Sequence, residues 1–140
     1  MYYLEEKLDE AEKEYKIAIE INNKEPMAHN NLGIIYKNKE KFQEADEEYD
    51  KELSFNPYYF AAYANKAILY GKMGRDEDAL NAWKKSLEIN PRFAKALYNI
   101  FTYYYQKQDK ENAIFWINET QRRGIPLLPE MQKMLNPFAR

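Results

Sequence analysis

Apolar side chains recur at intervals of three and four residues along most of the chain. One series, between residues 27 and 39, consists of Ala28, Leu32, Ile35 and Tyr36. A second series, between residues 42 and 55, consists of Phe42, Ala45, Tyr49 and Leu53. This spacing places the side chains on one face of an α-helix. Only the polar segment Asn38-Lys39-Glu40 separates the two series. We therefore expect two antiparallel helices joined by a tight turn.

The whole pattern repeats after 34 residues. Tyrosine recurs as Tyr2, Tyr36, Tyr70 and Tyr104, and alanine recurs as Ala11, Ala45, Ala79 and Ala113. Asparagine recurs as Asn22, Asn56 and Asn90, and proline follows the last two as Pro57 and Pro91. Because the residue before proline avoids helical backbone angles, each Asn-Pro pair predicts the end of one hairpin and the start of the next. We expect the small residues Gly33 and Ala67 to face Ala45 and Ala79.

These repeated residues resemble the tetratricopeptide repeat family. Its pattern of an aromatic or large residue, Leu-Gly, Tyr, Ala, an aromatic residue and Pro is matched by His29, Leu32-Gly33, Tyr36, Ala45, Tyr49 and Pro57. The next copy reads Tyr63, Lys66-Ala67, Tyr70, Ala79, Trp83 and Pro91. A degenerate copy reads Leu97, Ile100-Phe101, Tyr104, Ala113, Ile117 and Pro126, and half a copy reads Tyr2, Ala11 and Tyr15. The resemblance implies an all-α, right-handed superhelical solenoid of antiparallel helix hairpins.

The repeat pattern predicts a single domain over residues 1–140. We expect a partial repeat over residues 1–25, full repeats over 26–59 and 60–93, a degenerate repeat over 94–127 and a capping helix over 128–140. The capping helix would present Leu128, Met131, Met134 and Leu135 to the last hairpin. A repeat array needs such an element because its last apolar face has no following repeat to cover it.

Two departures from the repeat pattern carry structural expectations. Phe101 stands where the other copies have a small residue, so the third hairpin should splay or pack differently. The chain begins inside a hairpin, so that residues 8–21 form a second helix without its partner. Ala11, Tyr15 and Ala18 would then form an exposed apolar strip, and such strips are typical of association surfaces. Residues 8–21 could thereby mediate a homo-oligomer.

Composition excludes several classes of function. The chain has no cysteine and one histidine, which excludes thiol chemistry and leaves no histidine pair for a metal. Its net charge of −2 divides into −7 over residues 1–57 and +5 over residues 58–140. Without a concentrated basic face, we expect no nucleic-acid partner. No apolar run approaches the length of a membrane span, and a cysteine-free chain of this kind is typical of the cytoplasm.

Candidate catalytic and phosphate-binding motifs have structural interpretations. We interpret His29 as a helix-packing residue, because no serine or threonine lies one helical step from it. Gly71-Lys72-Met73-Gly74 lacks the strand and the Gly-Lys-Ser/Thr ending of a phosphate loop, which favours a helix end. Asp76-Glu77-Asp78 suits the first turn of a helix, with Asp76 as its cap. We therefore expect no catalysis, no metal and no cofactor.

One further set of polar residues recurs at the repeat period. Asn31, Asn65 and Asn99 fall on the first helix of each hairpin, and tetratricopeptide domains commonly use asparagine there to hold a ligand's main chain. Lys95 lies one turn before Asn99, and Tyr98 lies beside it. The candidate peptide-binding groove is thus Asn31, Asn65, Lys95, Tyr98 and Asn99. The alternative is that the asparagines only tie adjacent helices together.

The resemblance implies a protein–protein interaction scaffold or adaptor that binds a peptide or helix of a partner protein in its concave groove. In chaperone-binding members, five residues clamp the carboxylates at a ligand's C-terminus. Asn65 and Lys95 match two of these places, whereas Asn30, Ile34 and Asn99 depart from the other three. We therefore disfavour a carboxylate clamp. The alternative function is an assembly module that acts through the open N-terminal helix face.

Overall fold

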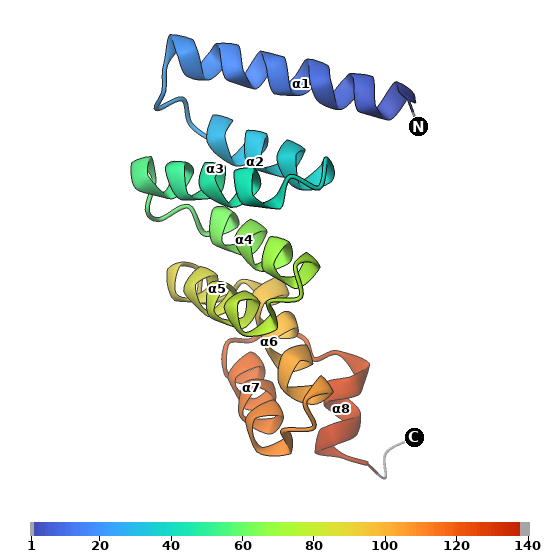
Figure 1. The fold of residues 1–140 in the computed structure, drawn as a ribbon. Coiled ribbons are helices and arrows are strands. Elements are labelled where there is room, and N and C mark those ends of the chain that lie inside the picture. Colours follow the sequence, from blue (N-terminus) through green and yellow to red (C-terminus); the bar gives the residue numbers. More distant parts are fainter. Residues whose placement is uncertain (1, 138–140) are drawn as a thin grey trace.

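The protein is a stack of helices. The computed structural model describes residues 2–137, with side chains for residues 4–137. This part contains eight α-helices and no strand, which confirms the all-α prediction (Figure 1). The helices are α1 (Tyr2–Ile21), α2 (Ala28–Asn38), α3 (Phe42–Phe55), α4 (Phe60–Lys72), α5 (Asp76–Ile89), α6 (Ala94–Gln106), α7 (Lys110–Arg122) and α8 (Pro129–Leu135). Helices α2/α3, α4/α5 and α6/α7 form three sequential hairpins, and each hairpin packs on the next.

The 34-residue period is also present in the backbone of the turns. Glu40, Gly74 and Gln108 occupy equivalent positions and all have a left-handed backbone, with φ of 61°, 74° and 58°. The residue after each donates its N–H to the carbonyl oxygen of Tyr36, Tyr70 or Tyr104 at 2.8, 2.8 and 3.0 Å. This hydrogen bond closes the end of the first helix and reverses the chain. The recurring tyrosines therefore mark the end of each first helix.

Side-chain sizes are complementary between the two helices of each hairpin. Gly33 of α2 lies against the fully buried ring of Tyr49, not against Ala45 as we had expected. At the equivalent positions of the later hairpins, the pairs are Ala67 with Trp83 and Phe101 with Ile117, and the members of each pair share one apolar cluster. In the first two hairpins the larger residue of the pair is on the second helix, whereas in the third hairpin it is on the first helix. Contact between α6 and α7 is less extensive than in the other hairpins, as the sequence predicted.

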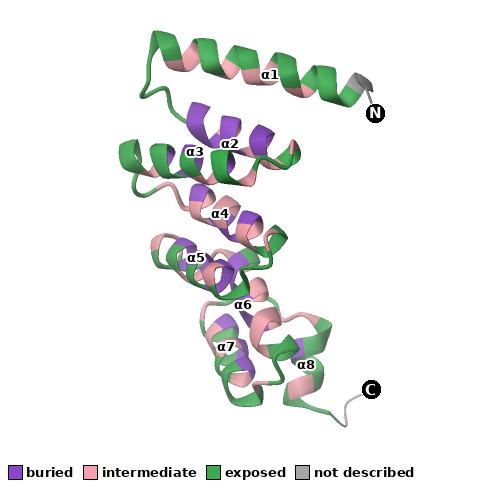
Figure 2. Cartoon of the chain, in the orientation of Figure 1, coloured by how far each residue is buried: buried purple, intermediate pink, exposed green. Residues whose placement is uncertain are grey.

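The N-terminal segment differs from the expected mid-hairpin start. Residues 2–21 form one continuous helix, and no turn precedes residue 8. Glu6 and Lys7, which correspond to the turn residues Glu40 and Lys41, are good helix formers and lie inside this helix. The strip of Ala11, Tyr15 and Ala18 is half-buried, with Tyr15 packed on the α2/α3 core, so the expectation of an exposed strip is wrong (Figure 2). The side chain of Tyr2 lies outside the described residues.

Ion pairs hold α1 onto the first hairpin. Lys39 Nζ lies 2.7 Å from Glu12 Oε2 and also pairs with Asp9, while Lys16 Nζ lies 3.0 Å from Glu12 Oε1. The hydrogen bond from Lys39, followed by that from Lys16, lowers the pKa of the Glu12 carboxyl from 4.5 to about 2. Because the folded-state pKa is depressed, Glu12 contributes stability above pH 4.5 and loses it as the pH falls toward 2.

We expect Glu12→Gln to cost about 1 kcal/mol at neutral pH and almost nothing near pH 2, since the lost attraction is partly screened by solvent. The check is urea unfolding followed by circular dichroism across the acid range. Glu14→Gln is the matched control, because Glu14 is exposed on the same helix. A wild-type minus Glu12→Gln difference that stays constant with pH would contradict the proposed linkage.

The C-terminal helix covers the last hairpin. Met131 of α8 is fully buried in a cluster with Phe101, Ala113 and Ile117, and Leu128 and Met134 pack against this cluster. Leu135 points more to solvent, with 41% of its surface exposed. Tyr98 of α6 donates its hydroxyl to the Pro126 carbonyl at 2.6 Å, which fixes the connection that leads into α8. The covering role predicted for Leu128, Met131 and Met134 is therefore confirmed, while residues 138–140 lie outside the described residues.

His29 is buried at the start of α2, as expected for a packing residue. Its Nδ1 lies 2.7 Å from Glu48 Oε2, and its Nε2 lies 3.0 Å from the Asn23 carbonyl oxygen. The ring also stacks on Phe55 at a centroid distance of 5.7 Å. His29 thus joins the α1–α2 connection to α3, and all of its ring nitrogens are engaged in structural contacts.

Candidate binding groove

The first helices of the three hairpins, α2, α4 and α6, lie together along one side of the stack. Asn65 of α4 donates its side-chain amide to the Asn30 side chain of α2 at 2.9 Å. Helix α6 packs against α5, and Leu97 of α6 belongs to the same apolar cluster as Ala67 of α4 and Trp83 of α5. We call the surface formed by α2, α4 and α6 the groove face. The side chains on the groove face belong to positions that point away from the second helix of each hairpin.

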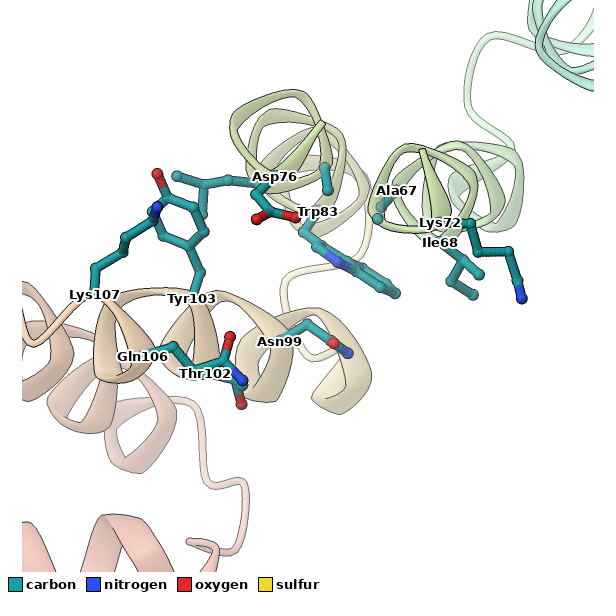
Figure 3. A pocket seen from close by; sticks show the side chains of 13 residues that line it. Ala67, Ile68, Lys72, Asp76, Trp83, Asn99, Thr102, Tyr103, Gln106 and Lys107 are labelled. Carbon is teal, nitrogen blue, oxygen red and sulfur yellow. The ribbon is translucent and has the colours of Figure 1, made fainter. Parts of the chain in front are cut away.

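An open hollow of about 460 Å³ lies on this face between α4 and α6 (Figure 3). Its floor is apolar and comes mainly from α5, where Leu80 and Trp83 are almost fully buried beneath it. The α4 wall is formed by Ala67, Ile68, Gly71 and Lys72. The α6 wall is formed by Asn99, Thr102, Tyr103, Gln106 and Lys107. The hollow thus offers an apolar floor between two walls that carry amide, hydroxyl and ammonium groups.

Asp76 is the acidic residue among those that line the hollow. It is the first residue of α5, and the preceding Arg75 occupies the cap position without a side-chain cap bond. The expectation that Asp76 caps the helix is therefore wrong, although its placement in the first turn is confirmed. In Figure 3, Asp76 lies toward the end of the hollow that holds Tyr103 and Lys107, and Lys72 lies at the other end.

The five residues predicted for the groove are not gathered around this hollow. Asn99 lines it and donates its amide to the Lys95 carbonyl within its own helix at 2.8 Å. Asn65 is engaged with Asn30, Asn31 is half-buried on α2, and Lys95 is exposed. Tyr98 is bound to the connection before α8. The ligand-binding role of this set stays a prediction, and Asn65 and Tyr98 also have structural contacts.

Several residues of the hollow were missed by the sequence reasoning. Trp83 was assigned only to the repeat pattern, Lys72 was considered only as part of a false phosphate motif, and Thr102, Tyr103 and Gln106 were not singled out. A usable signal existed. These α4 and α6 residues lie on a single side of their helices, one or two turns after the predicted asparagines. Extending the asparagine positions along the same helix face would therefore have identified them.

Sequence models of a known repeat family match most of the chain. A model described as TPR repeat matches residues 1–39, and two described as tetratricopeptide repeat match residues 28–59 and 60–93. The chain belongs to the tetratricopeptide repeat family. No curated protein sequence matches it.

Solved structures share this tetratricopeptide fold. A crystal structure of MamA superposes with a TM-score of 0.75 at 21% identity, covering 84% of this chain and 68% of MamA. A tetratricopeptide repeat protein from Parabacteroides merdae has a TM-score of 0.72 at 26% identity, covering 99% of this chain and 50% of that one. PilF of Pseudomonas aeruginosa has a TM-score of 0.71 at 15% identity, covering 87% and 55%. The chain therefore spans about half to two thirds of the length of these structures.

On the groove face, the charges of other lysines affect the pKa of Lys37. Burial lowers the pKa of the Lys37 ammonium, and the nearby charges of Lys72 and Lys95 lower it further. The Lys37 ammonium of α2 is thus influenced by lysines of α4 and α6. No helix of the described residues is long and apolar enough to cross a membrane.

Proposed function

We propose that the domain is a non-catalytic scaffold that holds a peptide or helix of another protein on the groove face. The observation that carries this proposal is the hollow between α4 and α6. Its floor of Leu80 and Trp83 offers apolar surface to a ligand side chain, and the amides of Asn99 and Gln106 lie on its wall. An amide supplies both donors and an acceptor, which complements the polar backbone of a bound segment. Family membership supports the same role, since tetratricopeptide arrays generally serve as interaction modules.

The test fills the hollow without disturbing the fold. A Cβ added at Gly71 meets no other atom within 4 Å, so Gly71→Trp should fold normally and occupy the space above Leu80. Random peptides displayed on phage are selected against the full chain and then measured by calorimetry. We expect Gly71→Trp to lose at least about tenfold in affinity, because a ligand side chain can no longer enter.

Asn81→Trp is the matched control, because Asn81 is exposed on α5 and does not line this hollow. It should bind the selected peptides as the wild type does. Equal binding by Gly71→Trp and Asn81→Trp would show that ligands dock elsewhere. Asn99→Ala then asks whether the predicted amide takes part, and it leaves the Asn30–Asn65 tie intact.

An assembly role through α1 is the second candidate function. The observation that favours it is apolar exposure on this helix, where Leu4, Ile17 and Ile21 are 64%, 47% and 82% exposed. These residues differ from the strip predicted from the sequence, which packs inward. In this case residues 8–21 would contribute Ile17 and Ile21 to a contact with another copy. Sedimentation that shows a monomer at every concentration would exclude self-association by this route.

A further inference from the structure

Charge is segregated between the two helices of the hairpins. The first helices, α2, α4 and α6, contain four lysines and no aspartate or glutamate. The second helices contain twelve acidic residues, six in α3, four in α5 and two in α7, against five basic residues in the same three helices. One consequence would be pairing between a first helix and a second helix packed against it, and Lys66 of α4 does pair with Asp46 and Asp50 of α3 in the preceding hairpin. Lys37, Lys72 and Lys95 have no such acidic partner among the described residues.

Lys37, Lys72 and Lys95 form no ion pair within the described part of the chain. Burial lowers the pKa of the Lys37 ammonium, and the charges of Lys72 and Lys95 lower it further. Lys37 and Lys72 line a second hollow at the ends of α2 and α4, of about 300 Å³. Glu40 also lines that hollow, from the α2–α3 turn, without pairing with either lysine. Uncompensated like charges destabilise the folded chain, and a bound anion would relieve their repulsion. Lys37 and Lys72, which line the same hollow, therefore point to an anionic ligand.

We propose that the partner segment held on the groove face is acidic, with at least one large apolar side chain beside its carboxylates. The apolar side chain enters the hollow above Leu80 and Trp83, and the carboxylates face Lys72 and Lys37, which line the second hollow. Lys72 lines both hollows and so joins the apolar site to the basic one. This inference rests on the proposed function and names the class of its partner.

An acidic peptide fits these observations better than a nucleic acid does. Two lysines make a small electrostatic footprint, and the acidic helices α3 and α5 would repel a long polyanion. The apolar floor of the neighbouring hollow also calls for a side chain that a phosphate backbone does not supply. The lysine arrangement differs from the five-residue clamp considered above, because Lys37 and Lys72 stand at the ends of their helices.

The same phage selection tests this inference. We expect the selected peptides to be enriched in aspartate and glutamate and to contain an aromatic or large aliphatic residue. Lys37→Glu combined with Lys72→Glu should weaken their binding by about tenfold or more at low salt, with a smaller effect at high salt. Lys13→Glu combined with Lys85→Glu is the matched control. It changes the net charge equally at exposed positions on α1 and α5, so binding should stay within about twofold.

Each other outcome has a defined meaning. Peptides that bind wild type but not Gly71→Trp, and that lack acidic residues, would overturn the inference while the proposed function stands. Peptides that bind wild type and Gly71→Trp equally would overturn both. Short single-stranded RNA serves as a second probe. RNA binding that the lysine reversals abolish and Gly71→Trp leaves unchanged would replace the acidic peptide with a nucleic acid. Circular dichroism of every variant excludes loss of fold as the cause.

Discussion

Phe101→Ala should destabilise the protein by about 3–5 kcal/mol, which is typical of a buried phenylalanine removed from a packed core. Phe101 is 2% exposed and lies in one cluster with Ala113, Ile117 and Met131. Its ring therefore fills space shared by α6, α7 and α8. In the other hairpins this position is occupied by Gly33 or Ala67. Phe101 is thus the residue that adapts the last hairpin to receive the covering helix.

The loss of stability in Phe101→Ala should be concentrated near the substitution, because each unit of a repeat array contacts mainly its neighbours. Hydrogen exchange should therefore increase most in α6, α7 and α8 and least in α2. Phe115→Ala is the matched control, since Phe115 lies on α7 with 51% of its surface exposed. The control should lose less than about 1 kcal/mol in urea unfolding. A loss in Phe101→Ala no larger than in the control would show that the covering helix does not depend on this ring.

The repeat period predicted the three hairpins because it reflects local rules. The Asn-Pro pairs stop α3 and α5, and the tyrosine carbonyls close α2, α4 and α6 in the same way each time. The N-terminal helix shows where this reasoning failed. Glu6 matches the turn residue Glu40 in the repeat, but Glu40 has a left-handed backbone whereas Glu6 lies inside a helix. Alignment with the repeat could not reveal that residues 2–21 remain one helix.

The candidate site was harder to predict because its polar side chains form hydrogen bonds with residues outside their own hairpin. Asn30 and Asn65 are 35 residues apart and bond to each other. Tyr98 bonds to the Pro126 carbonyl, which lies beyond the end of the hairpin that holds Tyr98. Neither partner follows from the repeat pattern. The charge segregation, in contrast, is present in the sequence and becomes visible once first and second helices are distinguished. Lys37, Lys72 and Lys95 could have been found in this way.

The second large effect is expected at Gly33, where any side chain must displace Tyr49. A Cβ at Gly33 would lie 2.6 Å from Tyr49 Cε1 and 2.8 Å from its Cδ1. The Tyr49 ring is fully buried in one cluster with Leu32, Tyr36 and Leu69. Gly33→Phe should therefore cost about 3 kcal/mol or more through overpacking. Gly71→Phe is the matched control, because the Cβ there meets nothing within 4 Å and phenylalanine has the higher helix propensity.

The third hairpin suggests how to rescue Gly33→Phe, since Phe101 is accommodated there opposite Ile117. Gly33→Phe combined with Tyr49→Ile transplants this pair into the first hairpin. The Tyr49 hydroxyl is buried and has no hydrogen-bond partner among the described residues, so removing it also removes an unsatisfied polar group. We expect the double variant to recover at least half of the stability lost in Gly33→Phe, measured as a double-mutant cycle in urea. Strictly additive losses would show that the two positions do not share one packing site, and that the exchange of large and small residues between hairpins is coincidental.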